Sequence, residues 1–199
     1  MRAVPSQWLL CALVALAIPA AARAEQGTVW LTGTIDGNGE SGRFRLPLEW
    51  LAAVDNEEAD TIRVEDVVIN AAELWKTYGD LPVGEARHVE KGVSKDGTAY
   101  DVLVVSERPA PTKAAGKVRV LNRDAKGKET DIRFPLDIPG LIQTIANSLL
   151  RIEGGQSRIS ADSISLNNPA DLQRLADYGP FILFEGGEED SSRVTIAIE

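Results

Sequence analysis

The chain has few of the side chains that carry metal and nucleophilic chemistry. Its 199 residues include one cysteine, Cys11, and one histidine, His88. Because a metal site needs several convergent histidine, cysteine or carboxylate ligands, we predict no metal site and expect His88 at the surface. The sequence also has no G-x-S-x-G nucleophile elbow and no G-x-x-x-x-G-K-[ST] phosphate loop. We therefore predict no catalytic residue and no cofactor.

Basic residues are scarce relative to acidic ones. Lysine and arginine number 21 against 30 aspartate and glutamate residues, a net charge of −9. The first 24 residues hold Arg2 and Arg23 and no acid, so the remainder carries 19 basic and 30 acidic residues, a net charge of −11. A phosphate backbone is bound by basic side chains, so the composition argues against a nucleic-acid-binding protein. The acidity favours a cationic partner, either a protein or a cationic peptide.

Residues 1–24 have the pattern of a signal peptide. Arg2 precedes an apolar run from Trp8 to Ile18, and alanine occupies the −3 and −1 positions before Glu25. The run is shorter than the ~20 apolar residues that span a bilayer, and no later segment is long and apolar enough, since polar residues, proline and glycine interrupt the best candidate, Ile138–Ile152. We predict cleavage between Ala24 and Glu25 and a periplasmic or secreted product with no membrane span. That product has no cysteine, because Cys11 is removed.

The remaining chain contains an internal repeat. The segment Asp36–Leu48 matches Asp124–Leu136, 88 positions on, at five of thirteen positions, where average composition would give about one. Residues 109–116 between the copies have no periodicity and the composition of a linker. The sequence therefore predicts two related α+β domains, residues 27–108 and 117–199.

Each copy is predicted to fold as two β-hairpins and two helices, in the order β-β-α-α-β-β, with the helices packed on an antiparallel sheet. Alternation in Val29–Ile35 and Arg43–Leu48, on either side of Asp36-Gly-Asn-Gly39, predicts the first hairpin. In the second copy, Val118 aligns with either Trp30 or Val29, and the register stays open.

Helices are expected after each opening hairpin. The apolar residues of Ile138–Leu150 recur at helical spacing, and Trp50–Val54 is their short counterpart. Asn70 and Asn168, each with an acid three residues on, are predicted N-caps of a second helix. Closing hairpins are predicted to turn at residues 94–97 and 186–190.

Several residues suggest a site only weakly. Asp36–Glu40 resembles the start of a calcium loop, but Ser41 and Pro47 replace the glycine and glutamate that such a loop needs, so we predict a hairpin turn. Trp75 is expected at the margin of a helix face, where a domain contact and a ligand contact fit equally well. The acids that could pair in a cleft fall in predicted loops, where charge is solvated: Glu57, Glu58, Asp60, Glu188, Glu189 and Asp190.

Three segments carry a resemblance to a known family. Arg133–Leu136 with the apolar helix that follows, Ile164–Leu172 and Ser192–Glu199 resemble the small α+β domain of bacterial envelope-stress proteins of the YvlB and LiaX type. The resemblance implies a role in sensing or buffering envelope damage by binding cationic peptides or antimicrobials directed at phospholipids. It carries no functional residue to this chain.

These observations favour an exported, non-enzymatic binding protein of the bacterial cell envelope, linked to envelope stress. One alternative is a hydrolase of envelope polymers that uses paired carboxylates, which would need two carboxyl groups in one cleft. The other is a purely structural tandem module. The sequence assigns no ligand-binding residue and no oligomeric state.

Overall fold

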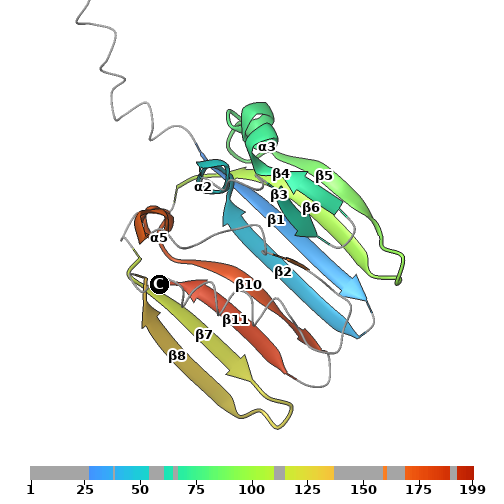
Figure 1. Ribbon diagram of the computed structural model, residues 1–199, viewed down its shortest axis with the longest axis vertical. Coiled ribbons are helices and arrows are strands. Elements are labelled where there is room, and N and C mark those ends of the chain that lie inside the picture. Colours follow the sequence, from blue (N-terminus) through green and yellow to red (C-terminus); the bar gives the residue numbers. More distant parts are fainter. Residues whose placement is uncertain are drawn as a thin grey trace, which may run out of the picture.

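The computed structural model describes residues 27–37, 39–53, 61–64, 67–109, 115–136, 159–160, 169–188 and 192–199. Eight strands form one antiparallel sheet in the order β5-β6-β1-β2-β10-β11-β7-β8 (Figure 1). Their bounds are β1 Thr28–Gly37, β2 Glu40–Pro47, β5 Ala86–Val93, β6 Ala99–Glu107, β7 Lys117–Arg123, β8 Glu129–Pro135, β10 Phe181–Glu188 and β11 Arg193–Ile198.

A smaller sheet and three short helices complete the described structure. The small sheet has the order β4-β3-β9, and the helices gather near one end of the large sheet's strands (Figure 1). Their bounds are β3 Thr61–Val64, β4 Val67–Asn70, β9 Ile159–Ser160, α2 Leu48–Ala53, α3 Ala71–Tyr78 and α5 Pro169–Ala176. No helix in these described ranges is long and apolar enough to cross a membrane.

Two predicted hairpins of the first copy are confirmed. β1 and β2 pair as far as Gly37 and Glu40, and Gly39 in the turn has φ +79°. β5 and β6 pair on either side of the predicted turn, where Gly97 has φ +92°. Glycine adopts this left-handed conformation without a steric cost, so the glycines at these two turns fix where the chain reverses. In the second copy, Glu188 belongs to β10 and not to a loop.

The structure describes one of the two predicted helix N-caps. The Asn70 side chain accepts a hydrogen bond from the Glu73 backbone N–H at 2.8 Å, which confirms it as the N-cap of α3. α5 begins at Pro169, the residue after the predicted cap. The predicted helix Ile138–Leu150 lies outside the described residues, as do the signal peptide and Asn168.

The predicted fold class, two α+β repeat domains that each pack two helices on their own sheet, is wrong. The strands of both segments belong to one sheet that is joined by β2 and β10, and strand predominates over helix. The helices are short, and β3 and β4, two strands that the sequence analysis did not predict, lie between α2 and α3 in the chain. Phe44 of β2 lies opposite Phe184 of β10, which gives an apolar side-chain pair across the junction. The backbone groups at the edges of β2 and β10 are also hydrogen-bonded there instead of exposed.

The large sheet has two halves with the same strand order. The first half is β5-β6-β1-β2 and the second is β10-β11-β7-β8. Pro47 lies opposite Trp30 in the first half, and Pro135 lies opposite Lys117 in the second. Lys117, and not Val118, thus corresponds to Trp30, so neither register considered above for Val118 is correct. The division into segments 27–108 and 117–199 stays a prediction.

One face of the large sheet carries the hydrophobic core. On β1, Leu31 and Ile35 point into it, with relative exposures of 0% and 6%. Leu48 and Trp50 of α2 pack in the same core, together with Leu175 of α5. Burial of such side chains contributes roughly 1.5–3 kcal/mol each, which makes this face the main source of stability. The opposite face of the sheet, which we call the open face, holds the side chains that alternate with the core residues.

Candidate functional site

An aromatic cluster lies on the open face at the start of β1. Trp30 points away from the core, since its neighbours Val29 and Leu31 point into it, yet Trp30 is only 5% exposed. Two aromatic rings that follow α5 cover it edge-on: Phe181 at a centroid distance of 5.0 Å and Tyr178 at 6.1 Å. Edge-to-face pairs at this distance are favourable, so the three rings form an aromatic cluster, in which Tyr178 and Phe181 also pack against the main core.

Arg45 of β2 covers the Trp30 ring from another side. Its guanidinium carbon lies 4.0 Å from the ring centroid, within the range of a cation–π contact. The same guanidinium donates from Nη2 to Glu107 Oε2 at 2.6 Å. Glu107 ends β6, on the other side of β1, so the contact ties three neighbouring strands together across the indole.

Two buried donors in this cluster have no acceptor among the described residues. They are the Trp30 indole Nε1 and the Arg45 Nε. A buried donor without a partner costs about 1–3 kcal/mol, and a charged donor costs more. Function is one of the reasons for which such a cost is retained, and here both donors belong to the same cluster.

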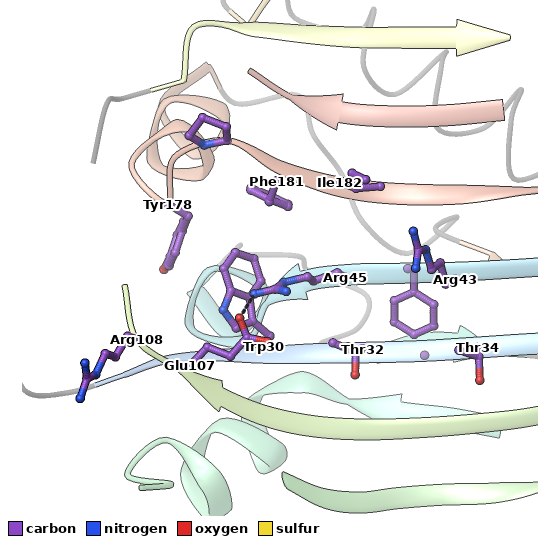
Figure 2. Close-up of a pocket in the computed structure, with 13 residues that line it drawn as sticks. Trp30, Thr32, Thr34, Arg43, Arg45, Glu107, Arg108, Tyr178, Phe181 and Ile182 are labelled. Atoms are coloured by element: carbon purple, nitrogen blue, oxygen red, sulfur yellow. Dashed lines mark hydrogen bonds and ion pairs between the residues drawn. The ribbon is translucent and has the colours of Figure 1, made fainter. Parts of the chain in front are cut away.

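A groove of about 470 Å³ opens beside the cluster, and we call it the Trp30 groove (Figure 2). Figure 2 shows Phe181 and Ile182 of β10 on one side of it and Thr32 and Thr34 of β1 on the other. It is lined by Trp30, Thr32, Gly33, Thr34, Arg43, Phe44, Arg45, Glu107, Arg108, Tyr178, Pro180, Phe181 and Ile182.

The lining is positively charged in a protein that is acidic overall. Three arginines line the groove against one carboxylate, Glu107. Arg43 donates from Nε to Glu185 at 2.9 Å, whereas Arg108 is exposed and makes no ion pair within the described part of the chain. Ligand sites commonly combine apolar walls with a few convergent polar groups, and this groove has that composition.

A bulge in β10 shapes the apolar wall. Between Ile182 and Phe184 the pairing with β11 shifts by one residue. Strict alternation would put Ile182 on the core face with Phe184, but the shift turns it toward the open face, where it is 42% exposed. Bulges often re-aim a side chain beside a functional site.

The second half of the sheet has a different open face. Arg119 donates to Asp131 at 3.0 Å and to Glu199 at 3.2 Å. Arg133 contacts the same two carboxylates, at 3.0 Å and 3.4 Å. The hydrogen bonds from Arg119 outweigh desolvation and lower the pKa of Asp131 below its usual value. This is a network of paired charges.

A second, smaller cleft of about 310 Å³ shares Tyr178 with the Trp30 groove. Glu49, Asp80 and Trp75 line it, and none of its lining residues is basic. The Tyr178 hydroxyl donates to Glu49 Oε2 at 3.4 Å, and burial together with that carboxylate raises the pKa of Tyr178. The hydroxyl therefore stays protonated and serves as a donor.

The structure locates some of the residues considered from sequence. His88 is exposed as predicted, with Nδ1 2.9 Å from Asp101 Oδ1. Desolvation raises the pKa of Asp101, but hydrogen bonds from His88 and Lys91 outweigh it and lower the pKa. Trp75 is half-buried against the core and lines the smaller cleft. The remaining loop acids lie outside the described residues: Glu57, Glu58, Asp60, Glu189 and Asp190.

The sequence analysis did not single out Trp30 as a candidate site residue. A signal was available, because alternation places Trp30 on the same side as Thr32 and Thr34, opposite Leu31. The first hairpin also predicts that Arg45 faces that side. An aromatic residue on the polar side of a strand, with an arginine across from it, indicates a local cluster and not the main core.

The chain matches no protein-family model, no curated protein and no solved structure. The resemblance to envelope-stress proteins therefore stays a prediction. Within the described ranges, no three histidine, cysteine, aspartate or glutamate side chains group as they would around a metal ion.

Proposed function

We propose that this is an exported, non-enzymatic binding protein of the cell envelope, and that the Trp30 groove binds a small ligand with an oxyanion and a compact apolar body. The observation that carries the proposal is the pair of buried, unpartnered donors, Trp30 Nε1 and Arg45 Nε. A phosphate, sulfate or carboxylate offers several acceptor lone pairs and would satisfy both, provided that the side chains covering these donors move aside as the ligand enters.

Electrostatics supports an anion at this place. Arg45 keeps donors beyond the one that binds Glu107, because a guanidinium has five N–H groups. Arg108 stands at the rim of the same groove with a free charge as far as the described residues show. Charge-assisted hydrogen bonds to an oxyanion are about twice as strong as neutral ones.

The apolar body of the ligand has a wall to pack against. Ile182 is 42% exposed in the groove, and Phe181 lies beside it (Figure 2). Covering apolar surface contributes about 25 cal/mol per Å². A ligand that combines an oxyanion with a small ring should therefore bind better than either part alone.

The test uses phenyl phosphate as the probe, with inorganic phosphate and phenol as its two parts, in titration calorimetry of residues 25–199. We expect phenyl phosphate to bind more tightly than either part. Arg45→Met should weaken binding at least tenfold, whereas the matched variant Arg133→Met, in the second half, should leave it unchanged. Equal losses from both variants, or no measurable binding to the wild type, would contradict the proposal.

A second candidate function is binding of a cationic partner at the smaller cleft. It is favoured by the lining of Glu49, Asp80 and Trp75 without a basic residue and by the net charge of −11. An oligolysine peptide should then bind with a marked salt dependence, and Asp80→Asn should weaken it. Turnover of an aryl glycoside that Glu49→Gln abolishes would instead favour the hydrolase alternative.

A further inference from the structure

The large sheet ends in two strands that each have one partner in the described structure. β5 pairs with β6 and β8 pairs with β7, and the two strands lie at opposite ends of the sheet (Figure 1). The outer N–H and C=O groups of such strands are a template for pairing with another strand. Two complementary edges on one chain could therefore join separate molecules.

The molecule already contains a pairing that shows how such edges fit. β2 and β10 join the two halves of the sheet through five residue pairs. Phe44 lies opposite Phe184, and Arg43 lies opposite Glu185, with which it forms an ion pair. We call this pairing the seam.

The two outer edges are the counterparts of the two strands in the seam. β8 corresponds to β2, because each is the second strand of its opening hairpin and ends in a proline, Pro135 or Pro47. β5 corresponds to β10, because each precedes the last strand of its half and carries a bulge at the matching place. The bulges lie between His88 and Glu90 in β5 and between Ile182 and Phe184 in β10.

We propose that β8 of one molecule pairs with β5 of a second copy of this chain, antiparallel and in the register of the seam. That register places Ile132 opposite Glu90 and Asp131 opposite Lys91. The contact is head-to-tail, so a pair of molecules still has one outer β5 and one outer β8. Further copies can add at these two strands, and the product is an open chain of copies. This assembly is independent of the ligand proposed for the Trp30 groove.

The side chains at the predicted contact agree with this register. Lys91 and Asp131 repeat the opposite charges of Glu185 and Arg43, with the signs exchanged between the two strands. Each already has a partner within the molecule, Asp101 for Lys91 and two arginines for Asp131, so the new pair would add to these contacts. Opposite charges directly across a strand pair are favourable. Ile132, at 44% exposure, would also gain cover.

One difference from the seam limits the strength of the contact. Glu90 stands in β5 where β10 has Phe184, so no aromatic pair forms. Only four residue pairs would meet within the two strands, against five in the seam, and charged edges generally restrain association. We therefore expect weak, concentration-dependent assembly that decreases as salt is added.

Disulfide trapping tests the register. Residues 25–199 contain no cysteine, so single-cysteine variants report one contact each. Oxidation of an equimolar mixture of Glu90→Cys and Ile132→Cys should give mostly the heterodimer. The control mixture, Glu90→Cys with Thr130→Cys, is two residues out of register on the same face and should give at least fivefold less heterodimer. Equal yields from the two mixtures would overturn the proposal.

Sedimentation velocity tests the charge pair without cross-links. Wild-type protein should associate as its concentration rises to ~1 mM, whereas Lys91→Glu and Asp131→Lys should each weaken association at least tenfold. The double variant, with both charges exchanged, should associate more strongly than either single variant. A wild type that stays monomeric, or a double variant no better than the single ones, would contradict the pairing; circular dichroism of each variant checks its fold.

Discussion

Arg45 and Arg133 occupy corresponding places in the two halves of the sheet, two residues before the proline that ends each strand, but their surroundings differ. Arg133 contacts two carboxylates, Asp131 and Glu199, in a network that it shares with Arg119. Arg45 contacts one carboxylate and an indole, and its Nε is buried without an acceptor in the described structure. The same strand order thus supports a network of paired charges in one half and a groove with spare donors in the other.

The difference teaches that topology alone does not make a site. The residue opposite the strand-ending proline is Trp30 in the first half and Lys117 in the second. An indole provides a flat apolar surface that excludes water and strengthens the cation–π contact. A lysine provides neither, so the arginine beside it finds carboxylates instead. The two halves therefore differ in these few side chains and not in the strand order.

The largest effect is expected from removing the indole. Trp30→Ala should destabilise the protein by about 3–5 kcal/mol, because it deletes a large buried side chain and exposes Phe181 and Tyr178. Lys117→Ala, at the corresponding exposed place, should stay within about 0.5 kcal/mol of wild type. Urea unfolding followed by circular dichroism measures both, and similar losses would remove the distinction between the halves.

A smaller effect is expected from adding a methyl group to Gly33. A Cβ at Gly33 would lie 2.1 Å from Cε1 of Phe44, a ring that is buried. Gly33→Ala should cost about 1–3 kcal/mol through overpacking. The corresponding pair in the second half, Val120 and Ile132, already carries a side chain at that place, and Val120→Ala should cost about 1 kcal/mol or less. Thermal unfolding measures the loss of stability in each variant, and the loss should be larger for Gly33→Ala than for Val120→Ala.

Ligand affinity should increase when the internal carboxylate of the groove is neutralised. Glu107→Gln keeps the size of the side chain but removes a negative charge near the proposed oxyanion. Two charges 4 Å apart in water interact by about 1 kcal/mol, so phenyl phosphate should bind roughly fivefold more tightly. Glu199→Gln in the second half is the control and should have no effect. Weaker binding by Glu107→Gln would show that the anion lies elsewhere.

The smallest effect concerns the pH dependence of the charged network. Hydrogen bonds from Arg119 lower the folded-state pKa of Asp131 below 3.8, so its stabilising contribution is present above that value and is lost as the pH falls through the folded pKa. The stability difference between wild type and Asp131→Asn should therefore shrink from pH 6 to pH 2.5. Asp80→Asn, outside the ion pairs of the described residues, should show a smaller change. Urea unfolding at pH 6 and at pH 2.5 measures the free energy of unfolding of each variant, and an unchanged difference for Asp131→Asn would contradict the prediction.

Local elements were predictable and long-range pairing was not. The turn at Asp36–Gly39 and the cap at Asn70 are encoded by adjacent residues, because glycine allows a positive φ and asparagine accepts a helix N–H. The seam joins Arg43 to Glu185, 142 residues apart. The alternation of apolar and polar residues in each strand does not predict which other strand pairs with it. For that reason the strands of the two copies were predicted to form two separate sheets, whereas they form one eight-stranded sheet.

The same limit applies to the groove. Alternation indicates that Trp30 and Arg45 face one side of the first hairpin, but the rings that cover the indole come from Tyr178 and Phe181, about 150 residues after Trp30. The bulge that turns Ile182 toward them has no sequence signature in this chain. The site could be suspected from the hairpin and was completed only by the second half.

The most direct test observes the unpartnered indole itself. Residues 25–199 contain three tryptophans, so ¹H–¹⁵N spectra should show three indole N–H signals, of which Trp30→Phe identifies one. Titration with phenyl phosphate should move the Trp30 signal in a saturable way and leave those of Trp50 and Trp75 in place. If the Trp30 signal stays fixed, or if all three move together, an oxyanion does not bind at this indole.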